Sequence, residues 1–204
     1  MTKRPDISAR RLAEIHQEML ECRRGYTSDS RFFKSTEIWE WLTHDDDNWS
    51  IMKYRGPNTE DYKRKAGVVA FDERVRLSVD ERLWDNAAKG QMFANFVLAH
   101  ELAHVALDHH SKGAVTKNFQ LFDGPSGQCN IPPTVEELEA NYGAVCFQCG
   151  AALEDPRWDS VTLAKRAFTD PLLVRKLSGL LTIQVVKKEL EVLRIRKARE
   201  RVIL

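Results

Sequence analysis

The 204-residue chain has no long hydrophobic run and only 4 cysteines. No stretch approaches the ~18 consecutive apolar residues that a membrane helix needs, so we expect no membrane span. The basic residues near the amino terminus are not followed by the apolar segment of a secretion signal. The cysteines are too few for a disulfide scaffold. These absences predict a reduced, cytoplasmic protein.

The composition is that of a folded domain, with 43% hydrophobic and 30% charged residues. The formal net charge is +1, yet the charges are unevenly distributed. Residues 165–204 hold 11 Lys and Arg against 4 Asp and Glu, a local net charge of +7. A segment of this kind could bind nucleic acid, a membrane surface or an acidic partner, or could be a solvated helix face.

The first half of the chain alternates between helical and strand patterns. Apolar residues recur at helical spacing over 8–24 and in a short amphipathic piece around 38–42. Residues 49–54 are typical of a strand, and 67–71 with 75–79 predict two strands across a tight connection. Because the last of these alternates apolar and polar residues, we expect it at a sheet edge.

The second half is predicted to be mostly helical. A helix is expected from about residue 88 to about 109, followed by a loop rich in Gly and Pro. Thr134 and Glu137 have the spacing of a capping box, so a second helix should begin there. Asp170 and Pro171 are typical of the first positions of a final helix or helix pair.

The sequence His100-Glu101-Leu102-Ala103-His104 lies within the first of these helices. Side chains four residues apart lie one turn from each other on the same helix face, so both imidazoles can bind one metal ion. Glu101 is close enough to contact a water at the metal without being a ligand. Two imidazoles and a carboxylate are typical ligands of catalytic zinc, so we predict one Zn²⁺ per chain. The alternative is a solvent-exposed helix that carries two histidines.

Two candidates arise for the third ligand. His110 has the spacing of the metzincin pattern, but that pattern needs a glycine where Leu107 stands. It also needs a methionine turn, and no Met follows the motif. We therefore expect His109 and His110 to lie around the ligands or to form a polar helix end.

The better candidate is Glu137, which a second helix crossing behind the first would present to the zinc. Glu136 is the alternative ligand. Asn141 lies one turn after Glu137, on the same face, where its amide could accept the outer N–H of a liganding histidine. Glu139 points to another side of this helix.

These two segments together resemble the ImmA/IrrE metallopeptidases. The signature of that family is His-Glu-x-x-His followed by a Glu-x-Glu-Ala-Asn helix, which matches residues 100–104 and 137–141. The resemblance covers residues 66–153 and includes the hairpin that leads into the motif helix. After Asn141 the family tends to continue with Phe-Ala, whereas Gly143-Ala144 stands here.

The resemblance implies a zincin-like fold of the gluzincin type, in the α+β class. It has a small antiparallel sheet, a His-Glu-x-x-His helix, a glutamate helix and a helical C-terminal segment. We expect the metallopeptidase domain over residues 1–156 and the basic helical segment over 157–204. The family further implies a bacterial or phage regulatory protease that cleaves a separate helix-turn-helix repressor in a DNA-damage or other stress response, including a role in phage defence.

The residues predict a single-zinc endopeptidase. Glu101 would accept a proton as water attacks a peptide carbonyl, and would then deliver it to the leaving amine. The expected edge strand at 75–79 would hold the substrate in extended form. Tyr142, His109 and His110 are candidates for stabilising the oxyanion. Two alternatives are a zinc-containing sensor without peptidase activity and a regulator whose basic segment binds single-stranded DNA.

Two of the cysteines are close together in the sequence, and a third lies between the two ligand helices. Cys146 and Cys149 form a lone Cys-x-x-Cys within a predicted helix, and buried structural thiols are the favoured interpretation. Cys129 lies in the loop between the two ligand helices. Its thiolate could bind the open position of the zinc and inhibit the enzyme, or it could have no role.

Overall fold

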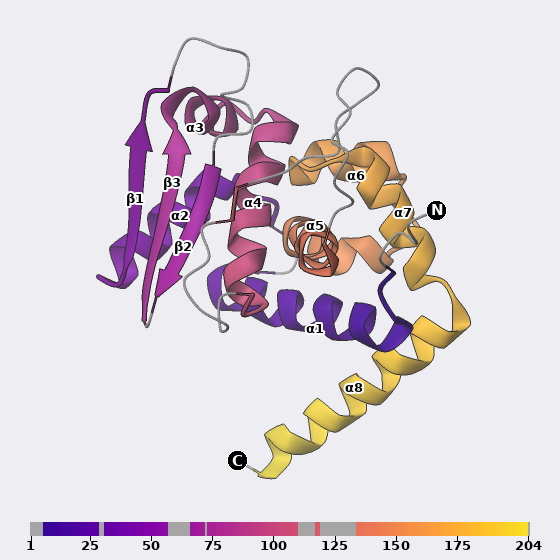
Figure 1. Cartoon of the computed structure of the whole chain (residues 1–204). Coiled ribbons are helices and arrows are strands. Elements are labelled where there is room, and N and C mark those ends of the chain that lie inside the picture. The colour runs from indigo at the N-terminus through magenta and orange to yellow at the C-terminus, as the bar shows by residue number, and fades with distance from the viewer. Residues whose placement is uncertain are drawn as a thin grey trace.

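The computed structural model describes residues 6–28, 31–56, 66–71, 73–109, 117–118 and 134–203. A small sheet packs on one side of a helical body, so the α+β class is confirmed (Figure 1). The elements are α1 (Ala9–Tyr26), α2 (Ser35–Asp45), β1 (Trp49–Tyr54), β2 (Ala66–Phe71), β3 (Arg74–Asp80), α3 (Glu81–Ala88), α4 (Met92–Ala106), β4 (Lys117–Asn118), α5 (Val135–Cys149), the 3₁₀ helix η2 (Gly150–Glu154), α6 (Ser160–Ala167), α7 (Pro171–Leu181) and α8 (Gln184–Ile203).

The sheet is mixed, with strand order β1-β3-β2-β4. β3 pairs in parallel with β1 and antiparallel with β2, so the expectations of an antiparallel sheet and of an edge position for residues 75–79 are both wrong. The alternation in β3 has a different cause. Val75, Leu77 and Val79 are buried on one face of the sheet, whereas Arg74 and Arg76 are exposed on the other. A central strand with one solvent-exposed face and a strand at the edge of a sheet both show alternating apolar and polar residues.

The helix expected over residues 88–109 is shorter in the structure, and a separate helix that the sequence did not predict, α3, precedes it. α3 ends before Gly90, whose φ of +85° suits glycine and interrupts the helix. The start of α3 does have a sequence signal, because Asp80 accepts a hydrogen bond from the backbone N–H of Arg82 as an N-cap. α4 then runs from Met92 and ends at Ala106.

α4 lies between β2 of the sheet and α5, and is buried on all sides from Ala94 to His104 (Figure 1). Buried polar contacts fix its position. The backbone N–H of Ser35 donates to Asn95 Oδ1 at 2.8 Å, and Trp39 Nε1 donates to the carbonyl of Leu98 at 3.0 Å. α2 therefore holds the helix that carries the metal-binding motif.

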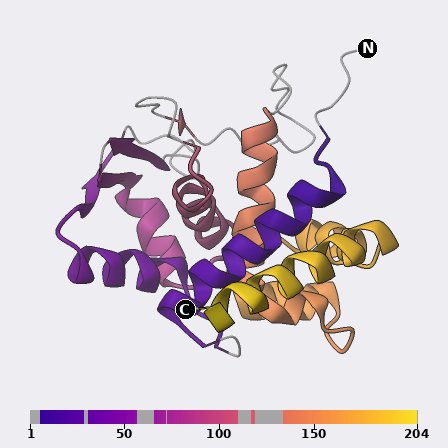
Figure 2. The same cartoon turned by 90° about the horizontal axis from the view of Figure 1, so that it is seen from below.

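The C-terminal helices belong to the same hydrophobic core as the rest of the chain. Leu163, Val174, Leu177 and Leu190 are buried within it. α8 lies along α1, as the view from below shows (Figure 2). Among the helices that the structure describes, none combines the length and apolar character needed to span a membrane.

Part of the positive charge of α8 is neutralised within the chain. Arg194 forms an ion pair with Glu154 at 2.6 Å, and Lys197 pairs with Glu21 of α1. These contacts join the basic helix to the acidic body. Both pairs are partly exposed, so each should add little to stability.

Gly143 lies at a close contact between α5 and α4. A Cβ at this position would lie 3.0 Å from Ala103 Cβ and 3.1 Å from Leu107 Cδ1. We expect Gly143→Ala to lower the free energy of unfolding by about 1–2 kcal/mol, because the gain in helix propensity is outweighed by overpacking. Gly179 of α7, where a Cβ would meet nothing within 4 Å, is the matched control. Urea unfolding should show Gly179→Ala to be as stable as the parent or more so; equal effects at both glycines would contradict the packing argument.

His16 of α1 is completely buried, and neither ring nitrogen has a hydrogen-bond partner within the described part of the chain. Burial lowers its pKa, and Glu154, whose Oε1 lies 3.5 Å from Nε2, opposes the shift only in part. The folded state therefore binds this proton less readily than the unfolded state does. Above about pH 6.5 the imidazole is neutral in both states and does not make stability depend on pH. As the pH falls below that value, the unfolded state takes up the proton and the free energy of unfolding declines.

When the pH is lowered from about 7.5 to about 5, we accordingly expect the free energy of unfolding to fall less in His16→Leu than in the parent. Urea midpoints measured at both pH values provide the comparison. The exposed His44 supplies the control, because His44→Gln should retain the full decline of the parent. The interpretation is wrong if His16→Leu declines as steeply as the parent.

Candidate metal centre

α4 and α5 bring two imidazoles and one carboxylate together. The Nε2 atoms of His100 and His104 lie 3.0 Å apart. The carboxylate oxygens of Glu137 lie 3.3 Å from Nε2 of His100 and 3.4 Å from Nε2 of His104. The two histidines are buried and Glu137 is nearly so. The three side chains therefore direct their donor atoms at one point.

This arrangement fits a metal ion. Ligand atoms at 2.0–2.1 Å from a tetrahedral ion lie about 3.3 Å from one another, close to the three distances between these atoms. The donor set is one that divalent transition metals accept. Although burial raises the pKa of Glu137, its contacts with His100 and His104 lower that pKa well below the usual value. Glu137 therefore offers a carboxylate to the site, and the group can hold a metal ion.

Glu101 lies beside this group and is fixed by the sheet. Its Oε2 accepts a hydrogen bond from the backbone N–H of Val68 in β2 at 2.9 Å. Its Oε1 is buried and has no hydrogen-bond partner among the described residues. Burial and the neighbouring Glu137 raise the pKa of Glu101 to about 8. One oxygen is thus anchored, and the other is left for a polar group that enters the site.

The helix α5 begins where the capping box predicts. Thr134 Oγ1 accepts a hydrogen bond from the backbone N–H of Glu137 at 3.2 Å, which fixes the first turn. The Glu137 carboxylate faces the two histidines, and Glu136 is outside the group. One turn later, Asn141 Oδ1 lies 3.1 Å from His100 Nδ1, which is the contact that the sequence predicts. This contact orients the ring of His100 so that Nε2 faces the other donor atoms.

His109 packs against His104 from the end of α4. Asp108 adopts a left-handed conformation with φ of 54°, and the backbone N–H of His109 donates to the carbonyl of His104 at 3.0 Å. Together with the bond from Asp108 N–H to Val105, this is a Schellman motif. The turn places His109 Nδ1 2.9 Å from His104 Nδ1. His109 therefore contacts the side of the His104 ring that faces away from the metal group.

A pair that sequence reasoning missed continues this contact. His109 Nε2 lies 3.1 Å from Glu139 Oε2, and Glu139 accepts two hydrogen bonds from Arg11 of α1, at 3.0 and 2.7 Å. Although burial opposes it, Arg11 and His109 lower the pKa of Glu139. Glu139 could have been found from the sequence, because it is the second glutamate of the Glu-x-Glu-Ala-Asn pattern at residues 137–141. Nothing in the sequence singles out Arg11, because 128 residues separate it from Glu139.

The other predicted site residues lie apart from this group. The ring of Tyr142 lies 5.3 Å from Lys176 Nζ of α7. His109 is the exception, since it contacts His104, but both of its ring nitrogens are engaged, by His104 and by Glu139. Cys146 and Cys149 are completely buried in α5, and burial raises the pKa of the Cys149 thiol to about 12. They are therefore inert structural thiols rather than metal ligands. Cys129 and His110 lie outside the described residues.

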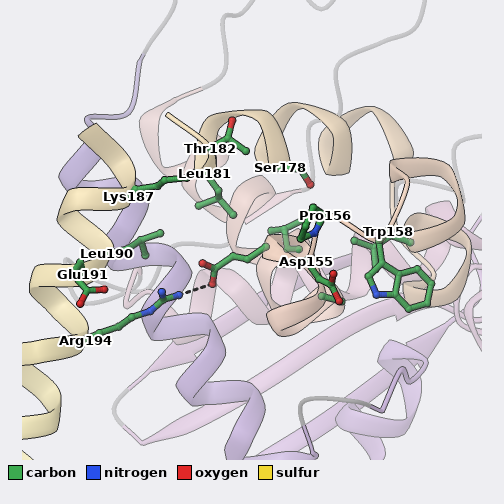
Figure 3. A pocket seen from close by; sticks show the side chains of 14 residues that line it. Asp155, Pro156, Trp158, Ser178, Leu181, Thr182, Lys187, Leu190, Glu191 and Arg194 are labelled. Atoms are coloured by element: carbon green, nitrogen blue, oxygen red, sulfur yellow. Dashed lines mark hydrogen bonds and ion pairs between the residues drawn. The ribbon is translucent and has the colours of Figure 1, made fainter. Parts of the chain in front are cut away.

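A cavity of about 540 Å³ opens between η2, α7 and α8 (Figure 3). Trp158, Leu181 and Lys187 line it, and the Arg194–Glu154 ion pair lies at its wall. None of the residues of the metal group lines this cavity. It belongs to the docking of α8 and has no part in the metal centre.

Comparison with protein-family models, curated proteins and solved structures found no match to this chain. The assignment of the site therefore depends on its own geometry and on the motif. What the geometry establishes is a group of His100, His104 and Glu137 that can hold a metal ion, with a buried carboxyl group beside it.

Proposed function

We propose that the protein is a zinc-dependent endopeptidase. The observation that carries the proposal is the convergence of His100, His104 and Glu137 next to the buried, half-anchored carboxyl group of Glu101. A structural zinc site ordinarily has four protein ligands. The described residues supply three protein ligands, and three ligands with a carboxyl group beside them are typical of a site that acts on water.

Zinc suits this donor set better than the hard cations, which prefer all-oxygen sites. A zinc ion bound there would act as a Lewis acid that polarises a peptide carbonyl and makes water acidic. Asn141 would keep the His100 ring oriented toward the ion. Glu137 contributes negative charge, since its pKa is lowered.

Glu101 has the position and the proton affinity of a general base. Val68 holds one oxygen, so the free oxygen has a defined direction. A carboxyl group with a pKa near neutrality can accept a proton from water and return it to the leaving amine. The positive charge of a bound ion would favour the ionised form of Glu101, which is the form that accepts the proton.

The outer edge of β2, rather than β3, is the strand edge nearest to this chemistry. The N–H of Val68 points from that edge to Glu101, and the two described residues of β4 pair with Gly67 and Val68 of β2. Ala70 lies two residues further along the same edge. We infer that an extended peptide pairs there with the main chain of β2, which would bring a substrate carbonyl to the metal.

The substrate implied by the resemblance to the ImmA/IrrE family is a separate helix-turn-helix repressor in a stress, DNA-damage or phage-defence response. A zinc-containing sensor without peptidase activity is the alternative. Single-stranded DNA as a partner is the weaker candidate, because acidic side chains of the body already pair with Arg194 and Lys197.

The test compares the zinc-loaded parent with Glu101→Gln on a peptide library derived from a bacterial proteome. Mass spectrometry should detect new peptide termini with the parent only. A co-expressed repressor should likewise be cut by the parent and remain intact with the variant. If the parent binds zinc and produces no new termini, the sensor is the correct function.

A further inference from the structure

Arg11 reaches the metal centre through a chain of three side chains. Arg11 binds Glu139 through two hydrogen bonds, Glu139 contacts His109 at 3.1 Å, and His109 contacts His104 at 2.9 Å. The chain joins α1, α5 and the end of α4. The side chains of Glu139 and His109 are 11% and 5% exposed, so water competes little for these contacts.

We propose that Arg11 is a positioning residue for the metal centre, acting through Glu139 and His109 on the ligand His104. This inference rests on the proposed metal site and deepens it. For His104 to bind a metal through Nε2, its Nδ1 must carry the proton and donate it. The geometry of the chain makes that the favoured tautomer.

The direction of each hydrogen bond follows from the two ends of the chain. Both oxygens of Glu139 accept from Arg11, so Glu139 is a carboxylate and His109 Nε2–H must be the donor between them. In a neutral imidazole the second nitrogen then accepts. His109 Nδ1 therefore accepts from Nδ1–H of His104, which leaves the lone pair of His104 Nε2 facing His100 and Glu137.

The left-handed conformation of Asp108 is needed for the contact between His109 and His104. Without the Schellman motif the chain would leave α4 before His109 could return to His104. A liganding histidine ordinarily has a carboxylate or carbonyl as its outer partner. Here a second histidine is inserted between the ligand and the carboxylate, and the arginine holds the carboxylate in place.

The experiment measures Zn²⁺ affinity by competition with a chromophoric chelator. We expect His109→Phe to bind zinc on the order of 10–100-fold more weakly than the parent and Arg11→Met up to about tenfold more weakly. Arg11→Lys, which keeps the charge but loses the bidentate geometry, should recover part of the loss. Arg10→Met is the matched control, because Arg10 lies on the same helix and its ion pair within the described part of the chain is with Glu14, at the surface.

Imidazole NMR spectra of the zinc-loaded proteins provide a readout that a purely structural role would not change. The parent should show a slowly exchanging Nδ1–H signal from His104, and its exchange with water should accelerate about tenfold or more in Arg11→Met and His109→Phe. Unchanged zinc affinity and an unchanged His104 signal in both variants would overturn the proposal. A parent that binds zinc in this way but cleaves no peptide would overturn the proposed peptidase and leave the positioning role intact.

Discussion

Glu101→Gln should bind one zinc ion per chain and lose about 10²–10⁴-fold in kcat/KM for peptide cleavage. Glutamine has the shape of glutamate and can still accept the hydrogen bond from the N–H of Val68, so the fold and the ligands are preserved. It cannot take up a proton from water at neutral pH. The loss should therefore appear in kcat rather than in KM or in metal content.

The ligand variants should fail in a different way. His104→Ala and Glu137→Ala remove donor atoms that lie 3.4 Å apart at the site, so zinc and activity should be lost together. Glu136→Gln is the matched control for Glu137, since Glu136 precedes it on α5 and lies outside the ligand group. Zinc content by elemental analysis and cleavage of a quenched fluorescent peptide measure both properties. Full activity in Glu101→Gln would contradict the role of Glu101 as the base, and full zinc content in Glu137→Ala would contradict its role as a ligand.

Arg23→Met should lower the free energy of unfolding by about 3–5 kcal/mol, because two buried carbonyls and one partly buried carbonyl would lose this donor. Arg23 is completely buried on α1. Its Nη1 donates to the carbonyls of Phe147 and Gln148 at 2.6 and 3.1 Å, and Nη2 donates to the carbonyl of Arg31. The first two carbonyls lie in the last turn of α5, where helix carbonyls have no N–H of their own helix to bind.

The same guanidinium explains the glycine that ends α5. Gly150 has a φ of +59°, and a Cβ there would lie 2.5 Å from Arg23 Nε. Gly150→Ala should therefore destabilise the protein as well, through both backbone strain and the clash. Arg24→Met, at the neighbouring exposed position, is the control and should change stability by less than about 1 kcal/mol.

Urea unfolding followed by far-UV circular dichroism measures these differences for the zinc-loaded proteins. A loss in Arg23→Met no larger than that in Arg24→Met would show that the buried guanidinium does not stabilise the end of α5. Because α5 carries Glu137, a real loss should also weaken zinc binding.

Local sequence determined the parts of this protein that depend on short-range geometry. His100 and His104 meet because a helix brings residues four apart onto one face. Thr134 begins α5 because its hydroxyl accepts the N–H of Glu137, and Asp170 begins α7 in the same way. β1, β2 and β3 were equally recognisable, since their alternation and β-branched residues are local properties, whereas β4 lies in the segment predicted to be a loop.

The tertiary structure decided what the sequence left open. The alternation in β3 is the same for an edge strand and for a central strand with one wet face, and only the pairing with β1 distinguishes them. Gly143 permits the close contact between α5 and α4, and the packing of the two helices presents Glu137 rather than Glu136 to the histidines. Arg11 joins the site from the other end of the chain. Contacts between residues more than a hundred positions apart leave no periodicity in a single sequence, so the outer contacts of the metal centre emerge only when the helices pack.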